Sequence, residues 1–374
     1  MKSRIKILMV AKGFEIQGIS NVILNYAEYI NRQKFIIDVA SGEHYAKSNV
    51  IRLKQAGGRF WYIPDRDKNI LSYMIKLSGI IKNEKYRIVH VHGNSAMVAP
   101  ELIAAKMGGA EVRIAHSHNV TCNHLGLDRL FHPVFSMFYT HALACSVEAG
   151  QWMFKKSPFI VMKNGISVSK YFFDPEERKK VRQKLGIKNE LVIGHIGCFN
   201  YQKNQDRLIS ILKKIIVYRT GVKLLFVGAG EDRERIEKLA KSQNLSEYCI
   251  FYGVSDEVEK LLAAMDVFVF PSRFEGLGIV LIEAQASGLS CIVSRNVPKE
   301  VNVTGTLKYI SLEADNVKWV DAITESGLSA DNTEERLLKS ARQCSIIREE
   351  GYEIKDVVRR LETFYEEVTE HEKS

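Results

Sequence analysis

Short apolar runs alternate along the chain with segments whose apolar residues recur every three or four positions. The short runs predict β-strands, and the recurring spacing predicts amphipathic helices. Strands that alternate with helices are typical of parallel sheets with crossover helices. In the first half we expect strands at residues 5–10, 35–40, 60–63, 88–92, 112–117, 141–145 and 159–162, and helices at 19–31, 70–83, 95–107, 129–140 and 147–155.

A polar, highly charged segment at residues 174–190 interrupts this alternation, and a second α/β series follows it. Its strands are expected at 191–197, 223–228, 249–252, 266–270 and 290–294, and a long amphipathic helix at 352–370 ends the pattern. A chain of 374 residues exceeds the size at which a single core usually stops growing. The pattern therefore predicts two doubly wound α/β domains.

The composition is that of a soluble globular protein, with 46% hydrophobic and 26% charged residues. No run of 18 or more apolar residues predicts a membrane span. The apolar start is short and contains Lys6, so a first strand explains it better than a signal peptide. Six cysteines without metal-ligand or redox spacing indicate reduced side chains and a cytoplasmic protein.

Positive charge is concentrated in the first half of the chain. Residues 1–180 hold 26 Lys and Arg against 14 Asp and Glu, a net charge of +12 within a chain of net charge +9. No nucleic-acid motif accompanies this charge, which favours attraction to a membrane surface or to an anionic lipid carrier over nucleic acid. Charge that serves only solubility is the alternative. Aromatic and basic residues at 129–156 suit either a surface in the lipid headgroups or buried helix packing.

The segment 266–294 carries the most specific signal in the chain. An apolar strand leads into a loop with Glu275, a helix is expected to open near Leu277, and Glu283 lies about two turns into that helix. Ligands of open α/β sheets bind at the carboxyl ends of the strands, and N–H groups at a helix start attract anions. We expect Glu283 to accept hydrogen bonds from ribose hydroxyls. The expected diphosphate-binding positions are Gly276, Leu277, Gly278 and Ile279.

The pair Glu275 and Glu283, with its surrounding residues PSRFEGLG and EAQASGL, resembles the E-x7-E motif of retaining glycosyltransferase family 4. The resemblance extends over nearly the whole chain and implies the GT-B fold, an α/β architecture in which two Rossmann-like doubly wound domains face a central cleft. We expect an amino-terminal acceptor domain at 1–175, a nucleotide-sugar domain at 176–345, and a final segment at 346–374 that crosses back to the first domain. The resemblance also implies that Glu275 contacts the donor sugar.

Three further loops match the family pattern. Gly197 and Lys203 follow the first strand of the second domain, where the family binds the diphosphate with an Arg–Lys pair. This chain has Cys198 at the arginine position, and Arg207 or Arg273 is a candidate to compensate. Gly228 begins the family's glycine turn near the nucleotide, and residues 252–254, including Gly253, are expected to contact the base.

Four histidines end two strands of the first domain, at positions 90, 92, 116 and 118. No carboxylate follows them at ligand spacing, so we expect no metal. The segment His116 to Asn119 resembles the family's first-domain histidine motif, which makes His118 the expected catalytic histidine beside Glu275 and Lys203, with His116 and Asn119 nearby. Gly18 is expected in an acceptor or phosphate loop, where Gln17 replaces a glycine common in the family.

These features predict a metal-independent retaining hexosyltransferase without a cofactor. It would transfer sugar from a nucleotide-diphosphate donor, most simply a UDP-sugar, to a glycan that is free or carried on polyprenyl diphosphate, in capsule or exopolysaccharide synthesis at the inner face of the cell membrane. Two alternatives remain open: a sugar-nucleotide epimerase of the same fold, and a non-catalytic subunit that binds sugar nucleotide.

Overall fold

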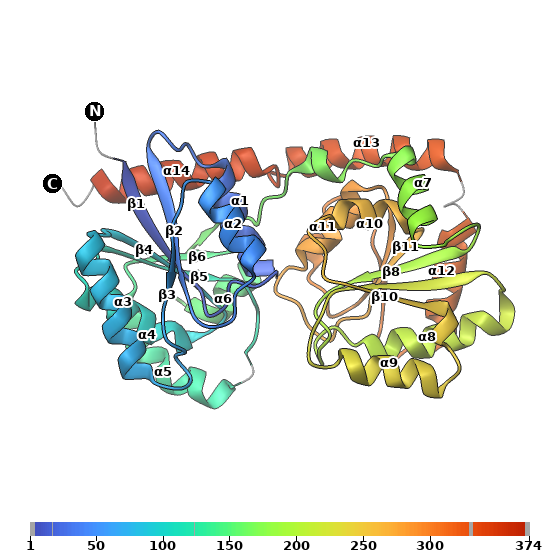
Figure 1. Cartoon of the computed structure of the whole chain (residues 1–374), viewed down its shortest axis with the longest axis horizontal. Helices are drawn as coiled ribbons and strands as arrows, with labels where there is room; N and C mark the ends of the chain where they lie inside the picture. The colour runs from blue at the N-terminus through green and yellow to red at the C-terminus, as the bar shows by residue number, and fades with distance from the viewer. Residues whose placement is uncertain (1–3, 17, 123, 329–331, 371–374) are drawn as a thin grey trace. The chain divides into compact units, whose positions relative to one another are not determined.

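The computed structural model describes residues 4–16, 18–122, 124–328 and 332–370 (Figure 1). The chain divides into two compact units: unit 1 comprises residues 1–166 and 351–374, and unit 2 comprises residues 167–350. The first division, after residue 166, lies nine residues before the expected boundary after 175, and the second, after residue 350, lies five residues beyond the expected boundary after 345.

Unit 1 is built on a seven-stranded parallel sheet with the order β3-β2-β1-β4-β5-β6-β7. Its strands are β1 (Ile5–Val10), β2 (Phe35–Ser41), β3 (Phe60–Tyr62), β4 (Ile88–Gly93), β5 (Val112–Ser117), β6 (His141–Ala144) and β7 (Ile160–Val161). All seven lie where the apolar runs predict them. The strands are apolar on successive positions because helices cover both faces of the sheet.

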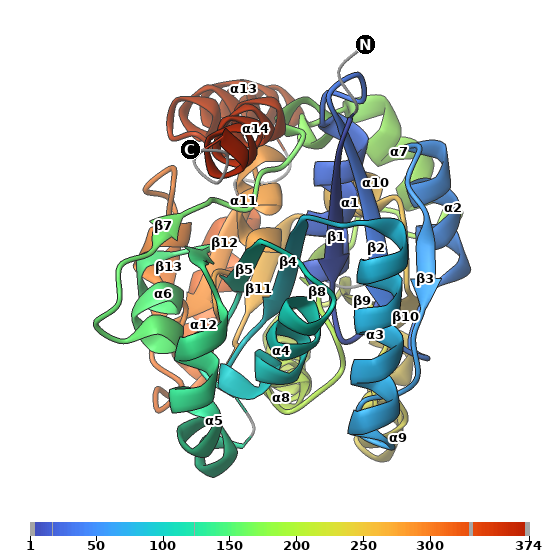
Figure 2. The same cartoon turned by 90° about the vertical axis from the view of Figure 1, so that its left-hand side faces the viewer.

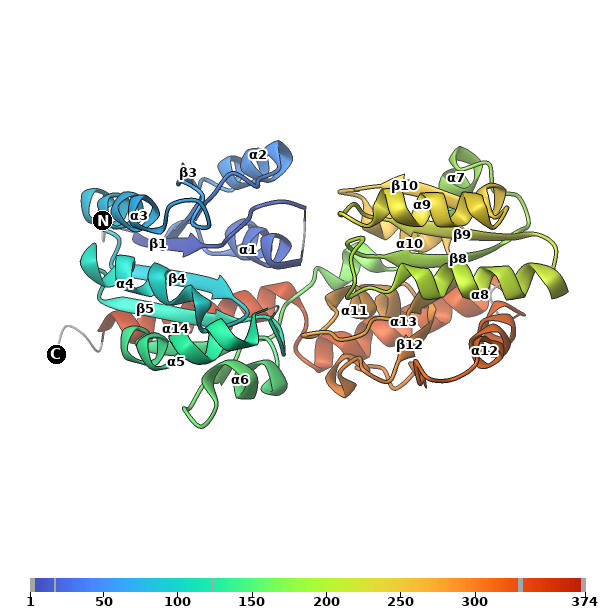
Figure 3. The ribbon, with the colours of Figure 1, turned by 90° about the horizontal axis from the view of Figure 1, so that it is seen from below.

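Helices α3, α4 and α5 cover one face of this sheet, and α1, α2 and α14 cover the other (Figures 2 and 3). Their bounds are α1 (Gly18–Tyr29), α2 (Lys47–Gln55), α3 (Ile70–Glu84), α4 (Ala99–Met107), α5 (Leu125–Phe138) and α14 (Ile354–Glu370), and α6 (Val147–Phe154) packs beside β6. The helix predicted at 95–107 is divided into a 3₁₀ turn, η1 (Ala96–Val98), and α4, whose first turn holds Pro100. Helix α5 begins four residues before its predicted start, and α2 was not predicted.

Unit 2 is built on a six-stranded parallel sheet with the order β10-β9-β8-β11-β12-β13. Its strands are β8 (Leu191–Ile196), β9 (Val222–Val227), β10 (Cys249–Gly253), β11 (Val267–Phe270), β12 (Ser290–Ser294) and the unpredicted β13 (Lys308–Ile310). One helical layer contains α8 (Gln205–Tyr218), α9 (Arg233–Ser242) and α12 (Asn316–Leu328), and the other contains α7 (Pro175–Lys184), α10 (Val258–Ala264), α11 (Ile279–Ala286) and α13 (Thr333–Glu349). Both sheets have the doubly wound arrangement expected from the alternating pattern.

The last helix, α14, belongs to the core of unit 1. Its buried apolar face contributes Val357, Leu361 and Phe364 to the same cluster as residues of β1 and α1. The hydroxyl of Tyr365 lies 2.7 Å from Nδ1 of His90 in β4. The amphipathic pattern at 352–370 therefore describes a helix whose apolar side completes a core begun more than three hundred residues earlier in the chain.

A buried cluster of charges holds α10 and β11 in place in unit 2. The Asp266 carboxylate accepts hydrogen bonds from Arg178 at 2.5 Å, from Arg182 at 3.1 Å and from the Val192 amide at 2.7 Å. Arg336 of α13, which is only 5% exposed, donates to the carbonyls of Leu262, Ala263 and Met265 at the end of α10. Carbonyls at the end of a helix need donors from outside it. Arg336 shares this role with Arg178, which also donates to the Ala263 and Met265 carbonyls.

Within the described residues, no helix combines the length and the apolar character needed to cross a bilayer.

Arg336→Met should lower the free energy of unfolding by about 3 kcal/mol or more, because it removes the hydrogen bonds that this buried guanidinium donates to the end of α10 and to Ser287. Chemical denaturation measures this loss. The matched control is Arg342→Met on the same helix, where the side chain is exposed and little change is expected. Equal stability of the two variants would show that the Arg336 contacts do not stabilise the fold.

Candidate active site

The carboxyl ends of β8 and β11 bring Lys203 and Glu275 together. The two strands pair directly, so the loops that follow them leave the same edge of the sheet. Nζ of Lys203 lies 2.7 Å from Oε1 of Glu275, and the two side chains are 15% and 5% exposed. Two of the three residues expected to be catalytic thus form one buried ion pair.

Several contacts hold Lys203 in this position. Its Nζ lies 4.6 Å from the centre of the Phe270 ring, a cation–π distance. Asn204 donates from Nδ2 to the Pro271 carbonyl at 3.1 Å, which ties the β8 loop to the β11 loop. A Cβ at Gly197 would lie 3.3 Å from three carbons of the Lys203 side chain, so glycine at this position makes room for the lysine stem.

Lys203 can still serve an additional ligand. An ammonium group has three N–H donors, and the hydrogen bond to Glu275 uses one of them. Glu275 in turn retains acceptor capacity for hydroxyl groups. The pair can therefore present both a cation and an anion to a bound molecule without either charge being left alone in the interior.

Helix α11 begins at Ile279, two residues after the predicted start. Gly278 precedes it in the left-handed conformation, with φ of +79°, which glycine adopts without strain. Glu283 therefore lies about one turn into the helix, and the expected two turns were wrong. Gly276 and Leu277 remain in the loop, so the amides at the helix start belong to Ile279 and its successors.

Glu283 is partly buried, and burial raises the pKa of its carboxyl group from 4.5 to about 7. The hydroxyl of Tyr171 donates a hydrogen bond to Oε1 of Glu283 at 2.8 Å. This hydrogen bond lowers the pKa of Glu283 and so opposes the effect of burial. Tyr171 lies in the 3₁₀ turn η2 (Val168–Tyr171), and nothing in its sequence surroundings indicates a site residue. Oε2 of Glu283 is the oxygen that this hydrogen bond leaves for other donors.

The glycine turn after β9 packs against the loop after β8. Gly228 has φ of +138°, and a Cβ there would lie 2.2 Å from the Gly197 carbonyl oxygen. Its amide donates to the Gly253 carbonyl at 2.8 Å, which joins the ends of β9 and β10. Close backbone packing is thus sufficient reason for glycine at 228, and the packing brings Gly197, Gly228 and Gly253 to one edge of the sheet.

The two arginines considered as substitutes at the Cys198 position are engaged elsewhere. Arg207 donates to the Ala314 carbonyl, with its guanidinium 5.9 Å from the Trp319 ring centre. Arg273 donates to the Tyr201 carbonyl and stacks on the Tyr201 ring at 4.1 Å. Lys203 is therefore the cation that the structure places beside Glu275.

In unit 1, the four strand-end histidines form a stack of imidazole rings. Nε2 of His90 lies 3.0 Å from Nδ1 of His116, and Nδ1 of His92 lies 2.9 Å from Nε2 of His118. Adjacent ring centres are 4.2 to 5.2 Å apart. Strand pairing explains the arrangement, since His92 of β4 and His116 of β5 are direct partners in the sheet.

The imidazoles of this stack are uncharged near neutral pH. Burial lowers the pKa of His118 to about 3, and burial together with neighbouring imidazoles lowers the pKa of His90, His92 and His116 well below the usual value. Among the described residues, Nδ1 of His118 has no hydrogen-bond partner. A neutral ring with a free nitrogen can donate or accept one hydrogen bond, depending on its tautomer.

His90, His92 and His116 also lie close enough for their ring nitrogens to approach one metal ion. His90 hydrogen-bonds to His116 and to Tyr365, and His92 hydrogen-bonds to His118, which accounts for part of the arrangement without an ion. Tyr365 lies near the end of the chain, and no pattern in the sequence predicts its contact with His90.

The remaining expected residues lie at the same edge of unit 1. Asn119 follows β5 and accepts a hydrogen bond from the Val120 amide with Oδ1 at 2.8 Å. Gly18 is the first residue of α1, and an added Cβ would meet no atom within 4 Å. Packing therefore does not require glycine there. Gln17 lies outside the described residues.

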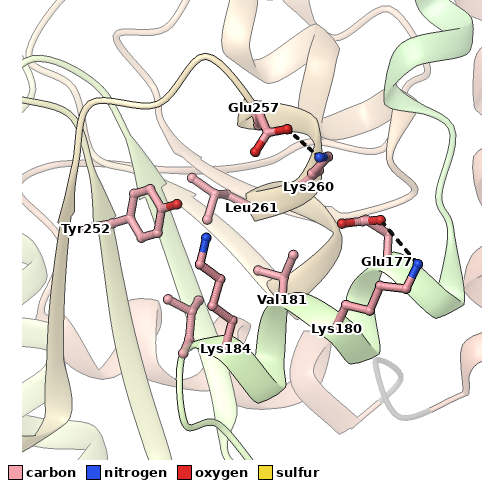
Figure 4. Close-up of a pocket in the computed structure, with 9 residues that line it drawn as sticks. Glu177, Lys180, Val181, Lys184, Tyr252, Glu257, Lys260 and Leu261 are labelled. Atoms are coloured by element: carbon pink, nitrogen blue, oxygen red, sulfur yellow. Dashed lines mark hydrogen bonds and ion pairs between the residues drawn. The ribbon is translucent and has the colours of Figure 1, made fainter.

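A separate cavity of about 130 Å³ lies between α7 and α10 in unit 2 (Figure 4). Its wall includes Tyr252, one of the three residues expected to contact the base, but no other residue expected to bind donor or acceptor. Two of its lysines pair with glutamates, Lys180 with Glu177 and Lys260 with Glu257. The wall also contains Lys184, so its lysines outnumber its glutamates by three to two.

A double-mutant cycle should show strong coupling between Lys203 and Glu275. Lys203→Met alone leaves a buried carboxylate unpaired and should lower the free energy of unfolding by about 3 kcal/mol. Adding Glu275→Gln removes that charge and should restore part of the loss. Denaturant unfolding of the four proteins measures the coupling, and additive effects would show that the pair does not interact.

Glu283→Gln should change how stability depends on pH. Between pH 4.5 and 7 the folded protein holds a proton on Glu283 that the unfolded chain has released, so the contribution of Glu283 to stability falls as pH rises through this window. Glutamine does not titrate. Relative to wild type, the variant should therefore gain up to about 3 kcal/mol of unfolding free energy between pH 5 and pH 8.

Thermal or chemical unfolding at several pH values measures this gain, with Glu313→Gln in an exposed loop as the control. If the unfolding free energies of Glu283→Gln and wild type differed by the same amount at every pH in this range, the Glu283 carboxyl would titrate as it does in the unfolded chain.

Comparisons with known proteins agree with this geometry. Residues 177–343, nearly all of unit 2, match the family model described as "Glycosyl transferases group 1". The chain is 27% identical to the putative glycosyltransferase EpsF of Bacillus subtilis over 98% of both sequences. It is also 27% identical to the UDP-Gal:alpha-D-GlcNAc-diphosphoundecaprenol alpha-1,3-galactosyltransferase of Escherichia coli, with 78% of this chain and 80% of that protein covered.

Among solved structures, Alr3699/HepE of Anabaena in complex with UDP-glucose superposes with a TM-score of 0.80 at 18% identity, covering 97% of this chain and all of the other. This likeness shows the fold. Residues 177–343 are thus similar to the group 1 glycosyltransferases, and the two doubly wound units have the GT-B fold.

Proposed function

We propose that the chain is a retaining hexosyltransferase that transfers a sugar from a UDP-sugar to a hydroxyl group of a glycan during surface polysaccharide synthesis, as in capsule or exopolysaccharide. The observation that carries the proposal is the buried Lys203–Glu275 pair at the carboxyl ends of β8 and β11. It provides a cation for a diphosphate and an acceptor for sugar hydroxyls within one contact.

Glu283 and the start of α11 complete the proposed donor site. The amides at the amino terminus of α11 are suited to phosphate oxygens, and the macrodipole of the helix favours the negative charge. The free oxygen of Glu283 would accept hydrogen bonds from ribose hydroxyls, with the Tyr171 contact fixing the orientation of the carboxyl group. Gly197, Gly228 and Gly253 would let the backbone approach the nucleotide.

In the proposed reaction the bond between the anomeric carbon and the diphosphate oxygen breaks, and UDP leaves with the electron pair. The acceptor oxygen forms its bond to the same face of the anomeric carbon, and its proton passes to the leaving phosphate oxygen. Lys203 would stabilise the charge on the leaving group, and Glu275 would hold the sugar. His118 is the proposed catalytic histidine of unit 1, where His92 holds its ring and leaves Nδ1 available.

The proposed donor and acceptor follow two relatives. The Escherichia coli relative is named for a UDP-galactose donor and a diphosphoundecaprenol-linked acceptor, and the Anabaena protein was solved with UDP-glucose. We extend these chemistries to this chain as a UDP-sugar donor and a glycan acceptor, free or linked to polyprenyl diphosphate, used at the inner face of the cell membrane. No cofactor or metal is needed in this proposal, because a lysine and amide dipoles would neutralise the leaving group.

Incubation of the pure protein with UDP-sugars and short glycan acceptors tests the proposal. Acceptor-dependent release of UDP, with retained anomeric configuration in the product, is expected, and excess chelator should leave the rate unchanged. Glu275→Gln should lower kcat at least 100-fold, because the contact to the sugar in the transition state is lost. The control is Glu313→Gln, which should keep the wild-type rate.

Other outcomes would contradict the proposal. An isomerised UDP-sugar without acceptor would indicate an epimerase. Binding of UDP-sugar without turnover would indicate a non-catalytic subunit. Activity lost in chelator and restored by a divalent ion would reject the metal-independent mechanism.

A further inference from the structure

The cavity between α7 and α10 in unit 2 combines aliphatic side chains with one aromatic ring. Val181, Leu185 and Leu261 supply the aliphatic part of its lining, and Tyr252 supplies the ring (Figure 4). An apolar cavity of roughly 150 Å³ is large enough for benzene. At about 130 Å³, the cavity between α7 and α10 has room for one six-membered ring and little more.

The position of Tyr252 in β10 explains why its ring reaches this cavity. Successive side chains of a strand point to opposite faces of the sheet. Phe251 packs against Phe226 and Phe199 in the core that contains α8 and α9. Tyr252 therefore points to the other face, which α7 and α10 cover. The register of β10 against β9 shifts between Phe251 and Gly253, which places Tyr252 at an irregular point of the strand, where a side chain is often redirected.

Two of the three lysines in the lining are matched by glutamates. Nζ of Lys180 lies 4.0 Å from a carboxylate oxygen of Glu177, and Lys260 forms an ion pair with Glu257. Both pairs connect residues three apart on one helix, so each is formed within α7 or at the start of α10. One lysine of the lining, Lys184, remains outside these pairs.

Lys184 is the last residue of α7 and is exposed. Figure 4 shows its ammonium group directed into the cavity, toward Tyr252 and Leu261. Among the described residues, Lys184 forms no ion pair. The carboxyl end of a helix attracts a cation only weakly, so this position leaves the three donors of the ammonium group available to an anion.

One unmatched ammonium group beside a ring-sized apolar space is complementary to a small aromatic carboxylate. The ring of such a ligand would pack against Tyr252 and the aliphatic side chains. Its carboxylate would accept a charge-assisted hydrogen bond from Lys184. A single negative charge suits the site better than the two charges of a phosphate monoester, because Glu177 and Glu257 also line the cavity and repel anions.

We propose that the cavity between α7 and α10 is a second ligand site of unit 2, for a carboxylate that carries a single ring. This site goes beyond the proposed transferase function. Tyr252 is the one residue that it shares with the expected donor contacts. The ligand would contact β10 through the Tyr252 side chain, whereas the nucleotide base is expected to contact the backbone of residues 252–254. The two ligands therefore need not exclude each other.

Titration of the protein with benzoate at constant ionic strength, followed by ligand-observed NMR, tests the site. Wild-type protein should bind benzoate with a Kd on the order of 1 mM, as expected for so small a ligand. Benzamide has the same shape and no charge, and it should bind at least fivefold more weakly. Lys184→Gln should weaken benzoate binding at least fivefold. The matched control, Lys179→Gln, removes an exposed charge from the same helix outside the cavity and should bind as wild type does.

Circular dichroism establishes that both variants are folded, which is expected because both positions are exposed. Absence of wild-type binding, or equal binding by Lys184→Gln and wild type, would overturn the site. An equal loss in Lys179→Gln would reduce the effect to net charge and overturn it as well. Loss of benzoate binding on addition of UDP would assign benzoate to the donor site instead. The titration requires no turnover, so its failure and a failure of the transferase proposal are distinguishable.

Discussion

The ion pair between Lys203 and Glu275 is the contact on which the proposed chemistry depends. Neither charge could remain in this buried position without the other, because an unpaired ion in a protein interior is strongly destabilising. The pair therefore fixes the relative position of two loops that are 72 residues apart in the chain. Gly197 and Asn204 have local roles that follow from it: one makes room for the lysine, and the other joins the two loops.

The two units place different chemistry at the carboxyl edges of their sheets. Unit 2 presents charge, in the form of an ammonium and two carboxyl groups. Unit 1 presents neutral imidazoles, whose pKa values are lowered because the rings are buried and stacked on one another. Neutral donors and acceptors suit hydroxyl groups, and charged ones suit phosphates. The proposed division between an acceptor side in unit 1 and a donor side in unit 2 would rest on this contrast.

Much of the fold could be predicted from the sequence, because buried parallel strands are continuous apolar runs. Helix α2 had no comparable signal, since Asn49 and Leu53 are its buried residues and the apolar Ile51 is 55% exposed. The spacing of Glu275 and Glu283 indicated a site, but the start of α11 depends on the left-handed conformation of Gly278, which the sequence alone does not specify. Contacts such as Tyr171 with Glu283 and Tyr365 with His90 join residues far apart in the chain, and no local pattern reports them.

The place of α14 in the unit 1 core has a consequence for biosynthesis. The ribosome completes all of residues 167–350 before it makes this helix, which at about 5–20 residues per second takes on the order of ten seconds or more. During that interval Val22, Ile23 and the neighbouring apolar residues of the nascent chain lack their final cover. Unit 2, which is continuous in sequence, can finish folding first, so the usual amino-to-carboxyl order of domain maturation is reversed.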